Sequence, residues 1–359
     1  MPLSRPITIV THPHCLAHDT GGGEHPEAPG RLTALLARLQ ASPLRDRLTM
    51  VEPRKAERRW LTTFHDEHYL FRLEECALSG KTHLDHPDNQ LCFDSYEAAL
   101  LSAGAGLTGI DLLEGEENLV FCAVRPPGHH AESNLALGFC FLNNCVLAAR
   151  YWQQQYGRRK ILVIDFDAHH GNGIQSAFEE DPEVFYLSLH EHPTFSFPGS
   201  GYAEETGTGP GRGATLNIPL PPGADDQMVL NAWSKRVEPA LAAFAPERII
   251  VAAGFDAHRD DDMSGLAYST EIYGKFGEYL AGWADQFCQG KLLSILEGGY
   301  HLESLADSAA TYLTALSNHN NITKSRHPGE SRGPEELPGA KDTGSESQQG
   351  LAYLRPTPE

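Results

Sequence analysis

The sequence lacks long apolar runs, an excess of basic residues and any CxxC pair of cysteines. No segment of the 359 residues approaches the ~20 apolar residues that span a bilayer, and the first apolar run, at 7–10, is too short for a secretory signal. The formal net charge of −20 argues against binding to nucleic acids or anionic membranes, which both select basic surfaces. Seven cysteines, an odd number, predict reduced thiols and a cytoplasmic location rather than a disulfide framework.

What the sequence does contain is an alternation of short apolar runs with segments of helical periodicity. This alternation predicts an α/β fold, a single domain over residues 1–317 with a parallel β-sheet flanked by helices on both faces. The predicted strands are 7–10, 119–124, 161–164, 184–189, 215–218, 248–253 and 291–296. The predicted helices are 31–39, 60–78, 96–113, 142–156, 228–244, 272–287 and 302–316. We interpret 83–94 as a polar loop.

The composition changes after residue 317. Segment 318–359 is polar, rich in Pro and Gly, and without apolar periodicity. Such a segment buries too little apolar surface to compensate for its ordering entropy, so we predict a disordered tail.

The stretch KILVIDFDAHHGNG, residues 160–173, is the most informative in the chain. Its apolar part predicts a strand that is buried on both faces, followed by Asp165, Asp167 and His169. Side chains two positions apart in extended chain share a face, so these three groups converge. Uncompensated carboxylates beside a buried strand are costly, which favours a metal site over a loop of solvated charges.

Three further strands end in similar polar motifs. They are RPPGHHA at 125–131, GFD at 254–256 and EGGY at 297–300. Each motif alone is weak evidence, because a single Asp after a strand is commonly a helix cap. Together they predict one site, because parallel α/β sheets bind ligands at the carboxyl ends of their strands.

The motifs RPPGHHA, GFCFLNN, DFDAHHGNG, AAGFDAHR and EGGY, in this order, resemble the histone deacetylase family. These are the metal-dependent deacetylases of the arginase/deacetylase fold, and the resemblance covers about residues 7–317. Asn172 and the wording GFDAHRDDD are more similar to class II and bacterial members than to class I.

The resemblance implies a catalytic metal held by Asp167, His169 and Asp256, usually Zn²⁺, with Fe²⁺ also compatible with these O and N ligands. It also implies a neighbouring monovalent cation, usually K⁺. The residues that match the ligands of this second ion are Asp165, Asp167, His169, Ser188 and Leu189.

Catalytic roles follow from the same resemblance. His130 corresponds to the general base that deprotonates the metal-bound water and then protonates the leaving amine, with Asn172 as its partner where class I has Asp. His129, paired with Asp165, corresponds to an electrostatic group. Tyr300 corresponds to the tyrosine that hydrogen-bonds the tetrahedral oxyanion.

The substrate residues implied by the resemblance surround an acyl-lysine tunnel. Phe139 and Phe197 match its aromatic walls, although Phe195 competes for the second position. Gly138 would offer its carbonyl group to the substrate amide, and Asp88 matches an aspartate at the rim that binds substrate backbone.

The residue seven positions after the third metal ligand stands at the tunnel mouth in this family, and here it is Met263. Lysine deacetylases tend to have Leu at this position, and polyamine deacetylases have Glu, which pairs with a distant ammonium group. An apolar Met263 therefore favours acetyl-lysine substrates, but Asp260, Asp261 and Asp262 leave open whether a neighbouring acid takes the position.

These observations predict a metal-dependent amidohydrolase that removes acetyl groups from the ε-amine of lysine in a protein or peptide. One alternative is a deacetylase of acetylpolyamines or other small acetylated amines. A ureohydrolase of the arginase type would need further aspartates in a DAHxD pattern, whereas His170 and Gly171 follow here. A non-catalytic acyl-lysine-binding module would not need an intact Tyr300. The sequence leaves the oligomeric state open.

Overall fold

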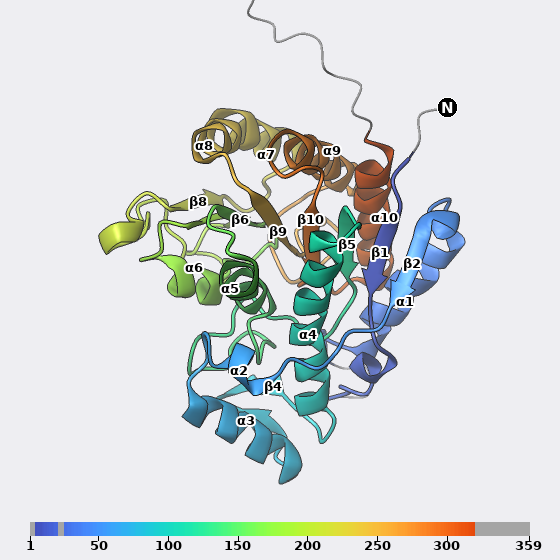
Figure 1. Ribbon diagram of the computed structural model, residues 1–359, viewed down its shortest axis with the longest axis vertical. Helices are drawn as coiled ribbons and strands as arrows, with labels where there is room; N and C mark the ends of the chain where they lie inside the picture. The colour runs from blue at the N-terminus through green and yellow to red at the C-terminus, as the bar shows by residue number, and fades with distance from the viewer. Residues whose placement is uncertain (1–3, 21–24, 320–359) are drawn as a thin grey trace, which may run out of the picture. The chain divides into compact units, whose positions relative to one another are not determined.

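A computed structural model describes residues 4–20 and 25–319 of the chain. Its centre is an eight-stranded parallel sheet in the order β2-β1-β5-β10-β9-β6-β7-β8 (Figure 1). The strands are β1 (Ile7–Val10), β2 (Leu48–Val51), β5 (Leu119–Cys122), β6 (Ile161–Asp165), β7 (Val184–Glu191), β8 (Thr215–Leu220), β9 (Arg248–Ala253) and β10 (Leu292–Leu296). This arrangement confirms the predicted α/β class with one parallel sheet.

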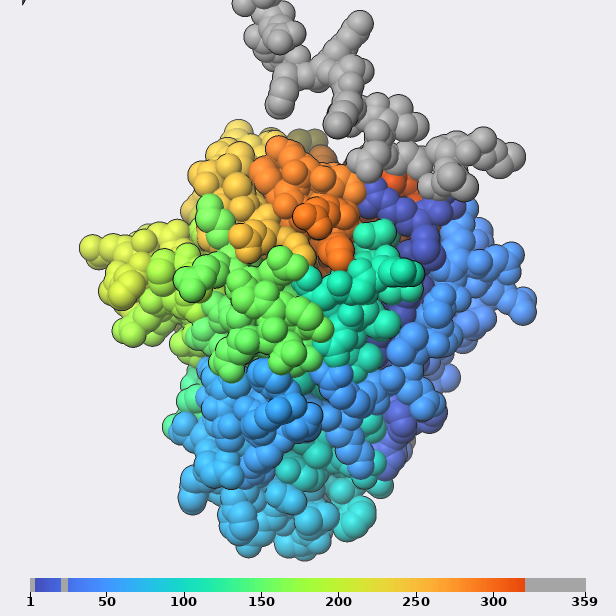
Figure 2. Space-filling view, in the orientation of Figure 1, coloured from blue at the N-terminus to red at the C-terminus, as the bar shows by residue number. Residues whose placement is uncertain are grey.

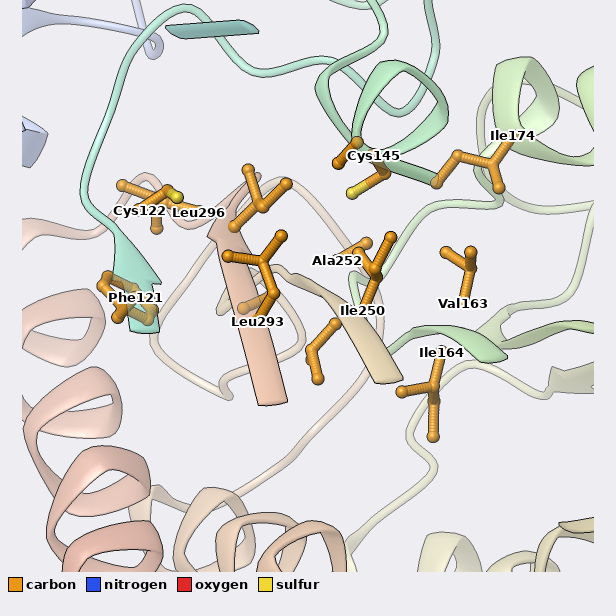
Figure 3. Packing of buried hydrophobic residues seen from close by; sticks show 14 of the residues in the cluster. Phe121, Cys122, Cys145, Val163, Ile164, Ile174, Ile250, Ala252, Leu293 and Leu296 are labelled. Atoms are coloured by element: carbon orange, nitrogen blue, oxygen red, sulfur yellow. The ribbon is translucent and has the colours of Figure 1, made fainter. Parts of the chain in front are cut away.

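Helices cover both faces of the sheet, as predicted. One face carries α4 (Ser95–Glu114), α5 (Asn144–Tyr156) and α6 (Asn172–Phe178), and the other carries α1 (Pro29–Ala41), α9 (Thr270–Phe287) and α10 (Leu302–Asn318) (Figure 1). Successive side chains of each strand point alternately to the two helix layers. Figure 3 shows Val163 on the side of Cys145 and Ile174, and Ile164 on the opposite side. This two-sided burial explains why the central strands are almost entirely apolar.

An aromatic cluster fills the α9 side of the sheet. The Phe166 ring lies 5.3 Å from Phe276 and 5.6 Å from Tyr312 between ring centroids. Trp233 stacks on Phe276 at 5.1 Å and belongs to a π-helical turn, Trp233–Val237, that joins α7 (Asp226–Ala232) to α8 (Glu238–Phe244). The predicted helix 228–244 is therefore continuous but locally widened.

The prediction of one helix over 60–78 was wrong. The segment forms α2 (Arg58–Leu61) and α3 (Glu67–Leu78), separated by a short turn. In that turn His65 Nε2 accepts a hydrogen bond from Asn143 N at 3.0 Å, and Asp66 N donates to Ser133 O at 2.8 Å. These tertiary contacts outweigh the helical spacing of the apolar residues.

The prediction of a loop over 83–94 was also wrong in part. Residues 83–90 form an antiparallel hairpin of β3 (His83–Leu84) and β4 (His86–Gln90), with Asp85 at a φ of 59°. The short 3₁₀ helices Pro13–Leu16, Arg45–Arg47 and Gly209–Gly211 complete the described elements.

The space-filling view shows segments from distant parts of the sequence side by side on one face (Figure 2). Among residues 4–20 and 25–319, no helix has both the length and the apolar character needed to cross a bilayer. The last described helix runs to Asn318, just past the predicted domain boundary. Residues 320–359 of the predicted tail lie outside the described residues.

Candidate active site

The four motif-bearing strands are neighbours in the sheet. The order β5-β10-β9-β6 places RPPGHHA, EGGY, GFD and DFDAHH along one edge of carboxyl ends. The side chains that the sequence predicted to converge therefore come from adjacent strands. The motif residues are almost all buried, with Asp165, Asp167 and Asp256 each 0% exposed.

Asp167, His169 and Asp256 form a cluster with the dimensions of a metal site. One ligand atom from each lies within 4.8 Å of the other two. His169 Nδ1 is 3.2 Å from Asp167 Oδ1 and 3.1 Å from Asp256 Oδ2. Two carboxylates and one imidazole fit a divalent cation and leave coordination positions for water and substrate.

The surroundings of His169 determine which of its ring nitrogens can bind a metal. Its Nε2 lies 3.1 Å from the backbone carbonyl oxygen of Met263, which can only accept a hydrogen bond. Nε2 therefore carries the proton, and the lone pair of Nδ1 faces the two carboxylates. Such a partner on the far nitrogen is characteristic of metal-bound histidines.

Backbone groups approach the carboxylates closely. Gly298 N donates to Asp167 Oδ2 at 2.8 Å, and Ala168 N donates to Asp256 Oδ1 at 2.8 Å. A Cβ at Gly298 would lie 2.2 Å from Asp256 Oδ2 and 2.6 Å from Asp167 Oδ2. Glycine in the EGGY motif is therefore required for the metal cluster as well as for the turn.

The tandem histidines lie against each other, with ring centroids 3.9 Å apart. His129 Nδ1 is 3.1 Å from Asp165 Oδ2. Burial disfavours the charged ring, but the Asp167 and Asp165 carboxylates outweigh it and raise the pKa of His129 to about 10. A charged His129 suits the electrostatic role implied by the resemblance.

His130 has the opposite character. Burial, together with the positive charge of His129, holds the pKa of His130 well below its ordinary value. Its Nδ1 lies 2.9 Å from Asn172 Oδ1, as predicted for this pair. His130 is therefore neutral at pH 7 and can accept a proton.

Glu297 was not assigned a role from the sequence, although it begins the EGGY motif. Its Oε2 accepts hydrogen bonds from Gly128 N at 2.7 Å and His129 N at 3.0 Å. Burial raises the pKa of Glu297 to about 7, against the opposing effect of His129. Glu297 thus holds the backbone of the tandem histidines. Its position directly after β10 was the sequence feature that could have indicated this role.

Tyr300 is held from behind by the N-terminal segment. The Arg31 guanidinium lies 4.8 Å from the centroid of the Tyr300 ring and donates to the carbonyl groups of Glu297 and Gly299. Burial and the nearby Asp256 carboxylate raise the pKa of Tyr300 well above its ordinary value. The hydroxyl group therefore stays protonated and can donate a hydrogen bond.

Arg31 belongs to a buried ionic cluster that sequence reasoning missed. Glu27 Oε1 accepts from Arg31 at 2.9 Å, and both Glu27 oxygens accept from Arg125. His18 Nε2 lies 3.3 Å from Glu27 Oε2. Glu27, Arg31 and Arg125 are all buried at 1% exposure or less. Arg125 lies 98 residues from Glu27 in the sequence, which hid the cluster from sequence reasoning.

Two aromatic rings lie beside His130 and Tyr300 at the metal cluster, as the resemblance implies. The Phe139 ring lies 5.8 Å from Tyr300, and the Phe197 ring lies 4.9 Å from His130. Phe195 is 66% exposed and lies against His192 instead, so the structure places Phe197 rather than Phe195 beside the site.

The backbone that carries the Phe139 ring is strained. Phe139 has a φ of 66°, which is unfavourable for a non-glycine residue, and Gly138 before it has a φ of 55°. Asn89 Oδ1 accepts from Phe139 N at 2.7 Å and supports this conformation. A Cβ at Gly138 would lie 2.3 Å from His130 Cδ2, so only glycine allows this approach.

The predicted rim residues lie around these rings. Asp88 precedes Asn89 on β4, and its side chain is 40% exposed. Met263 is partly exposed, and its carbonyl group binds His169 as described above. Asp261 is only 3% exposed and accepts backbone hydrogen bonds from Tyr300, His301 and Met263. It is therefore not the acid that could replace Met263 at the tunnel mouth.

The residues predicted for a monovalent cation lie on β6, on β7 and in the segment that directly follows β6. Asp165 and Ser188 are direct partners in the parallel register, and Leu189 follows on β7. Ser188 and Leu189 are at most 1% exposed. The Ser188 hydroxyl group bonds His190 Nδ1 at 2.7 Å, which leaves the backbone carbonyls of this segment as candidate ligands.

Known proteins of similar sequence and fold point in one direction. The model of the histone deacetylase domain matches residues 25–316. "Histone deacetylase 14, chloroplastic" of Arabidopsis thaliana is 35% identical over 309 residues, which cover 81% of this chain and 73% of that protein. A "probable deacetylase" of Archaeoglobus fulgidus is 35% identical over 298 residues, covering 82% and 81% respectively. The crystal structure of the HDA15 HD domain superimposes with a TM-score of 0.82 at 32% identity, covering 88% of this chain and 89% of the other.

Proposed function

The chain belongs to the histone deacetylase family, and from this premise we propose that it hydrolyses the acetyl amide on the ε-amine of lysine in proteins or peptides. The observation that carries the proposal is the convergence of the Asp167, His169 and Asp256 cluster with a neutral His130 and a protonated Tyr300. These are the groups needed for metal-assisted amide hydrolysis.

The site residues take distinct roles in this proposal. Asp167, His169 and Asp256 would hold a divalent ion, for which we propose Zn²⁺ and which would act as a Lewis acid on the acetyl carbonyl group and lower the pKa of water. His130 Nε2 accepts the proton of the attacking water and returns a proton to the leaving amine. Tyr300 donates a hydrogen bond to the oxyanion that develops on the acetyl oxygen.

The remaining groups bind the substrate and support the charge distribution. Phe139 and Phe197 bury the aliphatic part of the lysine side chain, and the Gly138 carbonyl group accepts from the substrate amide. We also propose K⁺ near Asp165 and the Ser188–Leu189 backbone, where it would offset part of the carboxylate charge. The seven free cysteines support a cytoplasmic location.

The decisive experiment is a hydrolysis panel with metal content measured in parallel. Acetyl-lysine peptides, longer acyl-lysine peptides and acetylated polyamines are compared by kcat/KM. We expect turnover of acetyl-lysine peptides that is lost on chelation and restored by Zn²⁺ or Fe²⁺. Tight binding of these peptides without turnover by the metal-loaded protein would instead indicate a binding module.

A small acetylated amine is the second candidate substrate, and Met263 is the residue that distinguishes the two. A polyamine brings a distant ammonium group that a carboxylate at the tunnel mouth can pair with, whereas Met263 is apolar. Met263→Glu should shift the kcat/KM ratio by about tenfold or more toward acetylpolyamines, because one close ion pair is worth about 1–2 kcal/mol when partly desolvated. Met263→Leu is the matched control, with an unchanged ratio. A wild type that is already faster on acetylpolyamines than on any acyl-lysine peptide would contradict the lysine proposal.

The structure argues against the two-metal arginase chemistry. A DAHxD pattern would need its second aspartate at position 171, where this chain has a glycine. The preceding His170 has both ring nitrogens engaged, by Ser200 Oγ at 2.9 Å and Gln175 Oε1 at 2.9 Å. In the described part of the chain, the only group of three or more potential ligands is Asp167, His169 and Asp256.

A further inference from the structure

Glu132 follows the tandem histidines by two residues and has no part in the roles described so far. The side-chain amide of Asn172 lies between the Glu132 carboxylate and the His130 ring. Asn172 Oδ1 is 2.9 Å from His130 Nδ1, and Asn172 Nδ2 is 2.8 Å from Glu132 Oε1. The three side chains therefore form a chain of hydrogen bonds that ends on the general base.

The chemistry of these groups sets the direction of every hydrogen bond. A carboxylate only accepts, so the NH₂ group of Asn172 must face Glu132. The same NH₂ group lies 3.4 Å from the carbonyl oxygen of His130, which also only accepts. The amide oxygen therefore faces the ring, where it requires a proton on His130 Nδ1. Nε2 is then left with its lone pair free.

An asparagine needs such a constraint more than an aspartate does. The two ends of an amide differ, and an amide rotated by 180° would present its NH₂ group to His130 and require the opposite tautomer. In that tautomer Nε2 carries the proton and cannot accept one from water. The two oxygens of a carboxylate are equivalent, so an aspartate at this position has no wrong orientation.

We propose that Glu132 is a positioning residue that keeps His130 in the base-competent tautomer by orienting the amide of Asn172. The inference rests on the proposed function, because it assigns Glu132 a role in the same hydrolysis. The Glu132 charge also polarises the amide, so that Asn172 Oδ1 is more negative than in an isolated amide. A neutral residue thus transmits part of the effect that a direct carboxylate would have on the base.

The backbone holds both ends of this chain in place. Glu132 N donates to Leu135 O at 3.0 Å, and the next residue, Ser133, accepts from Asp66 N at 2.8 Å. Asn172 is the first residue of α6 and is 9% exposed. The contact between Glu132 and Asn172 therefore does not depend on a free surface side chain.

The first test separates positioning from folding by kinetics. Glu132→Ala removes the acceptor and should lower kcat on an acetyl-lysine peptide by about tenfold or more, the usual effect of losing a group behind a reacting residue, with KM and bound metal unchanged. Glu132→Gln keeps an acceptor oxygen but not the charge, so its decrease in kcat should be smaller. Glu75→Ala, on the exposed surface of α3, is the control and should match the wild type in kcat and melting temperature.

The second test uses a change of sign. In Asn172→Asp the new carboxylate faces Glu132, and the two acceptors repel each other. Adding Glu132→Gln then supplies an NH₂ donor to the new carboxylate, so the double variant should be faster than Asn172→Asp alone. The same Glu132→Gln change slows the wild type, so the effect of one substitution reverses. A general loss of stability cannot produce this reversal.

The third test reads the tautomer directly. ¹⁵N NMR of histidine-labelled protein, with His130 assigned by the loss of its signals in His130→Ala, should show a protonated Nδ1 and a bare Nε2. In Glu132→Ala we expect a mixture of tautomers. If the wild type hydrolyses no acylated amine, the proposed function fails while this measurement still decides the inference.

Three results would overturn the inference: wild-type kcat in Glu132→Ala, no gain from Glu132→Gln in the Asn172→Asp background, or a single Nδ1–H tautomer in Glu132→Ala. If Glu132→Ala does not fold, Glu132→Gln and the double variant still decide the outcome.

Discussion

Each of the three histidines at the metal cluster has one ring nitrogen engaged by a distant partner. Asp165 takes His129 Nδ1, Asn172 takes His130 Nδ1, and the carbonyl group of Met263 takes His169 Nε2. The orientation of every ring, and the tautomer of the neutral His130 and His169, are thus set by residues outside the reacting centre. Single residues therefore affect the reaction by binding the ring nitrogen that does not take part in it.

Tyr300 provides a sharp test at this scale. Its hydroxyl group stays protonated because burial and Asp256 keep its pKa well above the ordinary value. Tyr300→Phe should lower kcat by about a hundredfold or more, the loss typical of one oxyanion donor, with little change in KM. Metal content by mass spectrometry should remain at the wild-type level.

Asp256→Ala is the matching variant on the ligand side. It removes one of the three groups within 4.8 Å of one another, so we expect loss of both bound metal and activity. Near-normal turnover by Tyr300→Phe would show that the tyrosine does not stabilise the oxyanion.

Motif residues were predictable from the sequence because they lie directly after buried strands. His130, Asn172 and Tyr300 all come to the site that their motifs indicated. The anchoring roles of Glu297, Asp261 and Glu27 were not predicted, because each acid has a partner far away in the sequence and a single acid has no pattern. Burial converts such acids into backbone or arginine anchors, and burial at a given position is a property of the fold.

At the scale of elements, the loop after β1 connects three parts of the fold. Glu27 lies between Arg31 of α1 and Arg125 after β5, and Arg31 reaches the turn after β10. One carboxylate and two guanidinium groups, all buried, hold the α1 layer against the edge of the sheet that carries the site. The cluster is therefore structural and also supports Tyr300.

Glu27→Gln should be strongly destabilising. It leaves two buried guanidinium groups with one neutral partner, and the loss of one member of a buried ion pair typically costs about 3–5 kcal/mol. Urea denaturation at pH 7 measures this loss. Glu57→Gln is the control, because Glu57 pairs with Arg59 at the surface, where its side chain is 55% exposed, and its loss should be near zero.

The destabilisation should also depend on pH in a defined direction. Arg125 holds the pKa of Glu27 well below its ordinary value despite burial, so the folded state binds this proton less readily than the unfolded state. The stabilisation is complete above the ordinary glutamate pKa of about 4.3 and is lost as pH falls below it. Glu27 also raises the pKa of the buried His18 against the effect of burial, so His18 takes up a proton more readily in the wild type than in Glu27→Gln. The difference in stability between wild type and Glu27→Gln should therefore widen between pH 7 and 5 and shrink as the pH falls below about 4.3. A difference that keeps growing below this pH would contradict this account.

The elements themselves were predictable to different degrees. Strand 248–253 was predicted to the residue, because a strand buried on both faces is an uninterrupted apolar run. The edge strand β2 was missed, because its pattern of burial, with Thr49 and Met50 exposed, has no such run. The break between α2 and α3 depends on contacts of His65 and Asp66 with distant residues, which local spacing does not encode.

For the whole molecule, the described residues end where the last helix meets the N-terminal segment. Arg5 N donates to Ser317 O at 2.8 Å, the Ser317 hydroxyl group donates to Arg5 O at 2.6 Å, and Arg47 donates to Asn318 Oδ1 at 2.8 Å. The two ends of residues 4–319 are thus joined by hydrogen bonds. The functional unit therefore extends at least to these contacts, slightly beyond the boundary predicted at 317.

Two truncations test where the folded unit ends. The composition of 320–359 is polar and without apolar periodicity, so a chain ending after His319 should keep the wild-type melting temperature and kcat/KM. A chain ending after Leu316 also loses the hydrogen bonds of Ser317 and Asn318 with Arg5 and Arg47. At about 1 kcal/mol for each of these partly buried hydrogen bonds, it should melt several degrees lower while keeping its activity at 25 °C. A large fall in melting temperature for the longer of the two chains would show that residues 320–359 stabilise the catalytic unit, and equal melting temperatures for both chains would show that the contacts at Ser317 contribute little.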